Sequence, residues 1–306
     1  IYPEREKKVI SIKNVPFRVS PRPFYIDGQC RTFLEECGIA IKEFFAACEK
    51  LINDKQAMPL NSRWRGYIRI NSHGVLLDAD NNYYHADNVF VRPDFILTPE
   101  GLALTEIETY PFGLPLDYIL QNIYRDSGYE ILGDEKKEFL LGFARRALGL
   151  QEDEPVTGRK LIFILSDGNI KFASQVEYFA AQLQQVGVSA KAVILPDVRG
   201  PPGSNNLVFD LMKEGPFTAY RCFYLRDALS SEYIREILSL AKDGKIRLVP
   251  SPSPFFDSKL PLALFHSEEY NSWFKNNLTE RSFDVLMKII PKTWVLDCDA
   301  KIGRAH

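Results

Sequence analysis

A strand, a helix and a second strand follow one another between residues 159 and 195, and this succession limits the possible folds more than any other stretch. The run "KLIFILSD" is apolar without alternation, as in a strand buried on both faces. The segment "IKFASQVEYFAAQLQQVG" repeats apolar residues at helical spacing and stops at Gly187, and "SAKAVILP" is a second apolar run. Such a βαβ succession implies parallel strands and a right-handed crossover. The sequence therefore predicts an α/β fold with a parallel, Rossmann-like sheet.

The same alternation of strands and helices continues after this unit. We expect strands in "GPFTAYRCFYL" and "KIRLVPSP", and a helix between them in "SSEYIREILSLAKDG". Before the unit lies "LQEDEPVTG", a charged segment with proline and glycine that is typical of a linker. We therefore predict a domain boundary there, which gives domains of residues 1–150 and 151–306.

The first half has a different pattern. Apolar residues at helical spacing predict a long helix around residues 30–53. Short strand-like runs follow in "GYIRI", "GVLLDA", "NVFVRPDFIL" and "LALTEIE", with turn residues at 80–82 and 99–101. Helices are then expected in "PLDYILQNIYRDSG" and "EKKEFLLGFARRALGL". The first half is thus predicted to be an antiparallel α+β region.

Charged side chains are concentrated on two of these predicted strands. Arg92 and Asp94 share one face of their strand because side chains alternate, and Glu106 and Glu108 share one face of the next. A hairpin at residues 99–101 would place the two pairs side by side. An arginine suits a carboxylate ligand, and paired carboxylates suit Mg²⁺ or an amine. Structural ion pairs or solvated strand residues are the alternative.

Two further residues are candidates for ligand contact. Gly113 lies in "YPFGLP", a turn flanked by prolines where the backbone can approach a ligand closely. Arg221, in "YRCF", leaves a predicted strand, where an arginine serves either a surface ion pair or a ligand. The residues alone leave that choice open.

The composition excludes broad classes of partner. The 38 basic and 40 acidic residues give a net charge of −2, so no general attraction to nucleic acid or to an anionic membrane is expected. No run of 18 or more apolar residues is present. The five cysteines form no CxxC pair and lie in apolar contexts, which favours reduced core thiols and a cytoplasmic location.

Common catalytic fingerprints are also missing. The loop "FILSDGN" lacks both the GxGxxG and the GxxxxGK[ST] patterns, and no GxSxG motif occurs. His73, His85 and His266 do not have metal-ligand spacing. The charged strands therefore remain the main candidate site.

Five segments in a fixed order resemble one enzyme group. They are "RPDF…TEIETYPFG", "ILSDGN…VEYFAAQLQQVGVSA", "AYRCFYLRD", "LVPSPSPFFDSKLPLALF" and "IIPKTWVLD", and they cover roughly residues 90–297. Together they resemble the substrate-side half of ATP-grasp ligases of the glutathione synthetase and glutathionylspermidine synthetase type. The resemblance implies a Rossmann-like pre-ATP-grasp lobe after the α+β region. Residues 1–89 match poorly.

The resemblance also assigns roles to residues. Arg92, with Asp94 two residues on, would hold a substrate carboxylate, and Glu106 would serve a Mg²⁺ or amine position. Glu108 stands where the relatives have Asn or Asp, which leaves the choice of substrate open. Arg221 would line the peptide site.

A lysine matches the same pattern near the chain's end. Lys259, in "FFDSKLPL", corresponds to the lysine at a helix start and would contact the cofactor. A solvated first-turn lysine is the alternative.

Ligases of this group form an acyl phosphate from a carboxylate and ATP, and an amine then attacks it. That chemistry needs a phosphate-holding ATP lobe, which nothing after "IIPKTWVLD" supplies. We therefore expect the substrate-binding half of an ATP- and Mg²⁺-dependent carboxylate–amine ligase, with neither cofactor bound tightly by this chain alone. Its partners would be a small or peptide carboxylate and an amine, and a homodimer is left open. The alternative is a non-catalytic module that binds an amino acid or small peptide.

Overall fold

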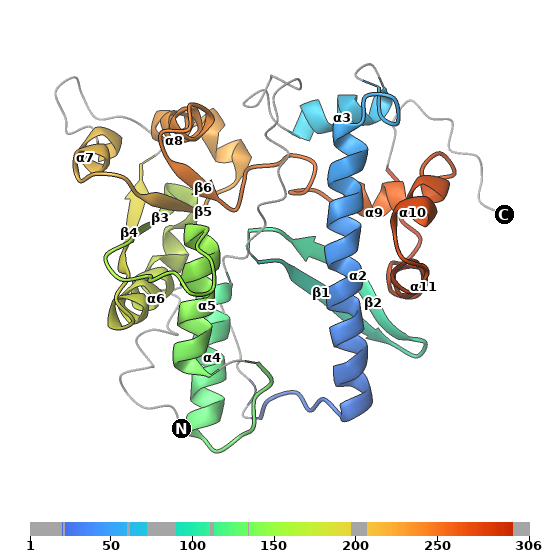
Figure 1. The fold of residues 1–306 in the computed structure, drawn as a ribbon, viewed down its shortest axis with the longest axis horizontal. Helices are drawn as coiled ribbons and strands as arrows, with labels where there is room; N and C mark the ends of the chain where they lie inside the picture. Colours follow the sequence, from blue (N-terminus) through green and yellow to red (C-terminus); the bar gives the residue numbers. More distant parts are fainter. Residues whose placement is uncertain are drawn as a thin grey trace. The chain divides into compact units, whose positions relative to one another are not determined.

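The predicted parallel sheet is present and has four strands (Figure 1). The computed structural model describes residues 20, 22–59, 62–71, 90–110, 113–133, 135–196 and 207–295. The strands are β3 (Lys160–Ser166), β4 (Ser189–Leu195), β5 (Thr218–Cys222) and β6 (Arg247–Val249). Their order is β4-β3-β5-β6, and every adjacent pair is parallel. Helix α6 (Ala173–Gln185) joins β3 to β4 after a short 3₁₀ turn, so the predicted strand–helix–strand unit is confirmed.

Strand β3 is buried on both faces because helices cover both sides of the sheet. Alternate residues Leu161, Phe163 and Leu165 contribute to a core with α6, while Ile162 and Ile164 contribute to a second core. The second core includes residues of α7 (Leu207–Lys213) and α8 (Glu232–Lys242). This two-sided burial explains why the strand's sequence is apolar without alternation.

Two helices that precede the predicted linker also cover this sheet. They are α4 (Leu114–Asp126) and α5 (Lys136–Leu148). Phe143 of α5 stacks on Phe163 of β3 with ring centroids 6.1 Å apart and planes at 10°, and it meets Phe179 of α6 edge-on at 4.9 Å. The segment predicted as a boundary therefore lies between elements of one core.

The chain divides into two compact units that are not consecutive in sequence. Unit 1 comprises Ile1–Tyr25, Ser72–Val91 and Thr109–Pro252, and it holds the parallel sheet. Unit 2 comprises Ile26–Asn71, Arg92–Glu108 and Ser253–His306. The predicted boundary near residue 150 falls inside unit 1, because the packing of α4 and α5 onto the sheet joins both sides of it.

Unit 2 is built around the long predicted helix, which is present as α2 (Gly28–Asn53). Asp27 caps it by accepting a 2.7 Å hydrogen bond from the backbone N–H of Cys30. Its apolar face packs on α9 (Leu260–Phe265), α10 (Asn271–Asn277) and α11 (Glu280–Ile289). Phe44 lies at the centre, with ring centroids 5.7 Å from Phe265 and 5.4 Å from Phe274.

Polar contacts flank this apolar interface. The carboxylate of Glu43 accepts hydrogen bonds from the backbone N–H and the hydroxyl of Thr279, at 3.0 and 2.9 Å. Thr279 is the N-cap of α11, so the carboxylate lies at the positive end of that helix. Two turns earlier on α2, Glu36 pairs with Arg281 at 2.6 Å.

One predicted strand is wrong. The run "GYIRI" lies within helix α3 (Arg63–Asn71). Trp64 and Ile68 are four residues apart and are both buried, so their spacing fits a helical face as well as a strand. Arg65 is also buried and donates to the carbonyls of Ile52 and Met58 near the C-terminal end of α2, which fixes the helical turn in place.

The predicted hairpin of the first half is confirmed as an antiparallel pair, β1 (Arg92–Thr98) and β2 (Gly101–Glu108). Pro99 and Glu100 form the turn, and Gly101 adopts φ +126°, which favours glycine. The strand predicted in "GVLLDA" and the turn at residues 80–82 lie outside the described residues.

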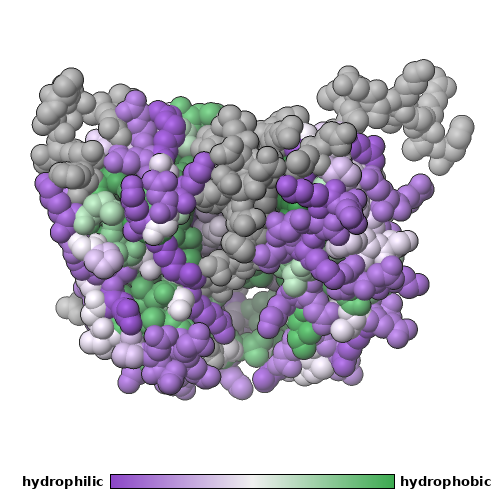
Figure 2. All heavy atoms as spheres, turned by 45° about the horizontal axis from the view of Figure 1, so that its top comes forward, coloured by the Kyte–Doolittle hydropathy of each residue, from purple (hydrophilic) through white to green (hydrophobic). Residues whose placement is uncertain are grey.

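The apolar residues of both units mostly face their cores. Figure 2 shows a face on which most described side chains are hydrophilic, with smaller hydrophobic areas between them. In the part of the chain that the structure describes, no helix has the length and apolar character needed to cross a membrane.

Candidate functional site

The hairpin of unit 2 brings the four predicted charged residues together. In its register Arg92 lies opposite Glu108, and Asp94 lies opposite Glu106. Residues directly opposite each other on antiparallel strands point to the same face. All four side chains therefore share one face, as predicted from the sequence.

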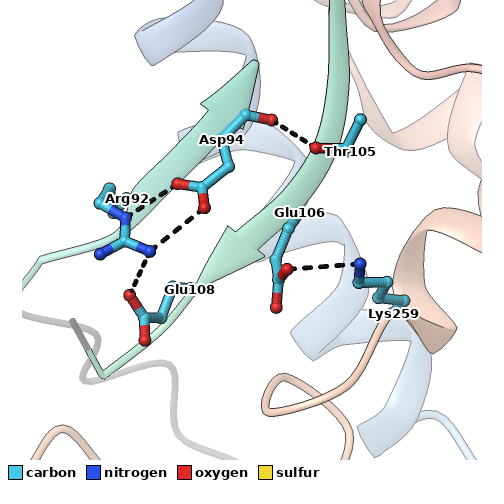
Figure 3. A network of polar contacts seen from close by, with 6 residues as sticks. All are labelled: Arg92, Asp94, Thr105, Glu106, Glu108 and Lys259. Carbon is cyan, nitrogen blue, oxygen red and sulfur yellow. Dashed lines mark hydrogen bonds and ion pairs between the residues drawn. The ribbon is translucent and has the colours of Figure 1, made fainter. Parts of the chain in front are cut away.

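Arg92 is the centre of this cluster (Figure 3). Its Nε and Nη2 donate to the two carboxylate oxygens of Asp94 at 2.8 and 3.1 Å, which is a bidentate pair. Nη2 also lies 2.9 Å from Oε2 of Glu108, an ion pair whose angles do not meet those of a hydrogen bond. The Arg92 side chain is 41% exposed, so the guanidinium is held by two carboxylates and still reaches solvent.

A β-bulge sets which face of β2 carries the acids. Pairing shifts between Asp94 and Phe95, whose partners are Glu106 and Leu104, so Thr105 is an extra residue in β2. Because Asp94 and Phe95 point to opposite faces, Leu104 and Glu106 do too. Regular pairing would place Glu106 on the same face as Leu104, which is fully buried.

The bulge is held by a side-chain contact. The hydroxyl of Thr105 donates a 3.0 Å hydrogen bond to the carbonyl of Asp94 (Figure 3). Bulges often re-aim side chains next to functional sites. Sequence reasoning missed this residue, because a single threonine in a strand carries no signal for a bulge.

Lys259 joins the cluster from a distant segment. Its Nζ lies 3.3 Å from Oε2 of Glu106 (Figure 3). Lys259 is the N-cap of α9, and Pro261 stands in the first turn of that helix. The lysine therefore begins a helix, as the sequence pattern indicates, and it neutralises the carboxylate that was predicted to hold Mg²⁺.

The cluster has an excess of negative charge. Three carboxylates, from Asp94, Glu106 and Glu108, face the two cations Arg92 and Lys259, which leaves a net charge of −1. Such an arrangement can exchange an internal ion pair for a ligand carboxylate, amine or hard cation. Among the residues that the structure describes, no three His, Cys, Asp or Glu side chains are grouped as a metal site.

Arg221 belongs to unit 1 and is fully buried. Its guanidinium lies 4.3 Å from the ring centroid of Tyr110, a cation–π contact, and its Nε donates to the carbonyl of Pro250 at 3.2 Å. These contacts tie β5 to the segment that follows β6. Any ligand contact by this side chain requires that one of these neighbours move.

Gly113, also in unit 1, is the N-cap of α4. Its φ of −71° and ψ of −13° are helical values that other residues adopt equally well. Part of the proline-flanked turn before it lies outside the described residues.

A polar network that sequence reasoning missed lies at the carboxyl ends of β3 and β5. The hydroxyl of Ser166 donates to Asp227 at 2.6 Å, and the amide of Asn169 donates to Ser166 at 2.9 Å and to the carbonyl of Cys222 at 3.3 Å. The only signal in the sequence was the polar stretch "SDGN" directly after an apolar strand. These hydrogen bonds link the carboxyl end of β3 to the carboxyl end of the adjacent strand β5.

Comparison with protein-family models and with curated protein sequences finds no match to this chain.

Proposed function

We propose that this chain contributes the substrate-binding part of an ATP- and Mg²⁺-dependent carboxylate–amine ligase. In this proposal Arg92 takes the substrate carboxylate, and the acids around it take the amine or the metal ion. The reaction forms an acyl phosphate that the amine attacks, so the site has to hold an anion and a cation close together.

The meeting of Lys259 with the hairpin is the observation that supports this best. The ligase resemblance singles out Arg92, Glu106 and Lys259 from segments separated by about 150 residues of chain. In the structure Glu106 pairs with Lys259 and lies opposite Asp94, which pairs with Arg92. Residues chosen by a motif alone therefore form one connected cluster.

The topology of unit 1 is compatible with a Rossmann-like lobe. The chain begins at an inner strand, β3, moves outward to β4, and then crosses back to β5 and β6 on the other side. Sheets that wind in two directions bind ligands where the strand order reverses, at the carboxyl ends of the strands. Here that point lies between β3 and β5.

The energies allow a ligand to compete for Arg92. An exposed ion pair contributes about 0–1 kcal/mol, and the Arg92 and Asp94 side chains are 41% and 40% exposed. A ligand carboxylate can form the same bidentate, charge-assisted pair with this guanidinium, and its other contacts then add to the affinity. A substrate carboxylate can therefore displace Asp94 from the guanidinium.

Calorimetric titration of the full chain with short acidic peptides and polyamines, with and without MgCl₂, tests this proposal. We expect Arg92→Ala to weaken the binding of an acidic ligand by about 2–4 kcal/mol, because the bidentate pair is lost. Glu108→Gln should strengthen the same ligand severalfold, since it removes a competing carboxylate. Glu106→Gln should leave the carboxylate contact intact and remove any dependence of binding on Mg²⁺.

Arg31→Ala is the matched control, because Arg31 forms an exposed ion pair with Glu35 in the same unit. It should leave every titration unchanged. The carboxylate site is wrong if Arg92→Ala has no effect on any ligand that binds the unmutated chain. The ligase proposal loses its support if neither acids nor amines bind.

A further inference from the structure

Unit 2 contains a cavity of about 660 Å³ to which the preceding sections assign no function. Helix α3, the segment after α9 and residues 292–295 line it, and none of the Arg92 cluster belongs to its lining. Its volume lies within the range of small-molecule sites, about 300–1,000 Å³. The cavity is therefore large enough for an amino acid or a dipeptide.

Part of the cavity lining is a set of residues that contact one another. The indole N–H of Trp64 donates to Glu269 at 2.8 Å, and the guanidinium of Arg63 lies 4.4 Å from the Trp64 ring centroid and 3.8 Å from Glu269. Trp64 is only 5% exposed. These three residues contact one another, and the proposal below does not use them as ligand groups.

The lining also includes charged side chains that form no polar contact with the rest of the described chain. The side chains of Lys292 and Glu268 are exposed and form no ion pair or hydrogen bond with any residue that the structure describes. Trp294 also lines the cavity, and it is 69% exposed. One exposed indole, one available cation and one available anion therefore line the same cavity.

We propose that this cavity binds an amino acid or dipeptide in its zwitterionic form, with an aromatic side chain. Lys292 would hold the ligand's carboxylate, Glu268 its ammonium group, and Trp294 would stack on the ring. A zwitterion carries one charged group for each of these two charged side chains, and the exposed indole offers a ring face for stacking. The inference depends on the cavity alone and not on the ligase proposal.

Four small probes separate the contributions of the three groups. They are L-phenylalanine, phenethylamine, which lacks the carboxylate, 3-phenylpropionate, which lacks the ammonium, and L-alanine, which lacks the ring. Binding to the full chain is measured by ligand-observed NMR titration. L-Phenylalanine should bind about fivefold more tightly than each of the other three, the factor expected for one exposed ion pair or stacking contact.

Three substitutions should change these preferences in different ways. Lys292→Gln should weaken L-phenylalanine and 3-phenylpropionate about fivefold and leave phenethylamine unchanged. Glu268→Gln should weaken L-phenylalanine and phenethylamine and leave 3-phenylpropionate unchanged. Trp294→Ala should weaken all three ring-containing probes. All three side chains are exposed, so the variants should fold.

Lys275→Gln and Glu280→Gln are the controls, because both residues are exposed in the same unit and outside the cavity lining. They should change no affinity, and neither should Arg92→Ala, which tests the other site. The proposal is overturned if L-phenylalanine does not bind, if L-alanine binds as tightly, or if Lys292→Gln and Glu268→Gln affect the charged probes equally.

Discussion

At the scale of single residues, the carboxylate of Glu43 shows how a helix end sets the pKa of its neighbour. Partial desolvation raises the pKa of Glu43, but hydrogen bonds from Thr279 and Ser282 lower it by more, so its pKa lies below the ordinary range of glutamate. A lowered pKa means that folding favours the ionised form. The contribution to stability is therefore complete above the unfolded pKa and is lost as the pH falls through the folded one.

We predict that Glu43→Gln lowers the free energy of unfolding by about 0.5–1 kcal/mol near pH 7, since a charge-assisted hydrogen bond becomes a neutral one. The difference should shrink as the pH falls below the ordinary pKa of glutamate and through the lower folded one. Urea unfolding at a series of pH values measures both. A constant deficit in Glu43→Gln at all pH values would contradict the argument.

The site itself was partly predictable at this scale. Alternation alone places Arg92 with Asp94 and Glu106 with Glu108, because it is a local property of the chain, but the bulge at Thr105 is what turns the two pairs to the same face. The pairing of Glu106 with Lys259 could not be predicted from alternation, since it depends on tertiary packing between distant segments. Its only advance signal was the resemblance to a ligase pattern.

At the scale of elements, predictions succeeded where the pattern was long. Strand β3 and helix α6 were predicted because an unbroken apolar run and a helical repeat each leave few alternatives. The run "GYIRI" is five residues long and satisfies either periodicity. Next to this run, Arg65 donates to the carbonyl of Ile52 at the end of α2 and to that of Met58, and local sequence does not report such contacts.

A mutation on one face of strand β3 should affect the packing of the core on that face and not the core on the other face. Phe143 stacks on Phe163, whereas Ile164 points into the opposite core. A double-mutant cycle of Phe143→Leu with Phe163→Leu should give a coupling energy of about 0.5–1.5 kcal/mol. The cycle of Phe143→Leu with Ile164→Val should be additive, and urea unfolding measures both. Equal coupling in the two cycles would show that the residues do not face separate cores.

At the scale of the whole chain, the division into units was beyond sequence reasoning. A boundary sought as a polar linker assumes that each domain is one continuous segment. Unit 2 is instead assembled from three segments, and one of them, Arg92–Glu108, is little more than the hairpin. Only contacts between distant residues reveal such a division.

Chemical labelling of buried cysteines can measure the unfolding of each unit separately, because both units contain one. Cys48 is fully buried in unit 2, and Cys222 is 3% exposed in unit 1. Burial raises the pKa of both thiols far above the ordinary value, and burial followed by the nearby Glu36 raises the pKa of Cys37 to about 11. Thiolates are the reactive form, so these three thiols should be inert while the chain is folded.

We predict that a thiol reagent at pH 8 labels Cys30, which is partly exposed, at least about tenfold faster than Cys37, Cys48 or Cys222. Mass spectrometry of peptides from chain labelled for increasing times measures each rate. In urea above the unfolding transition the four rates should converge. Fast labelling of Cys48 or Cys222 without denaturant would contradict the packing of the corresponding core.

The extra residue at Thr105 also determines where this hairpin can change length. Deleting it would leave Glu106 opposite Asp94 and Leu104 opposite Phe95, so the same side chains would still meet. Deleting Ile107 instead would separate Glu106 and Glu108 onto opposite faces. Related sequences that lack one residue at position 105 should therefore keep both the polar face and the buried one. An alignment gap there is neutral for the site, and a gap two positions later is not.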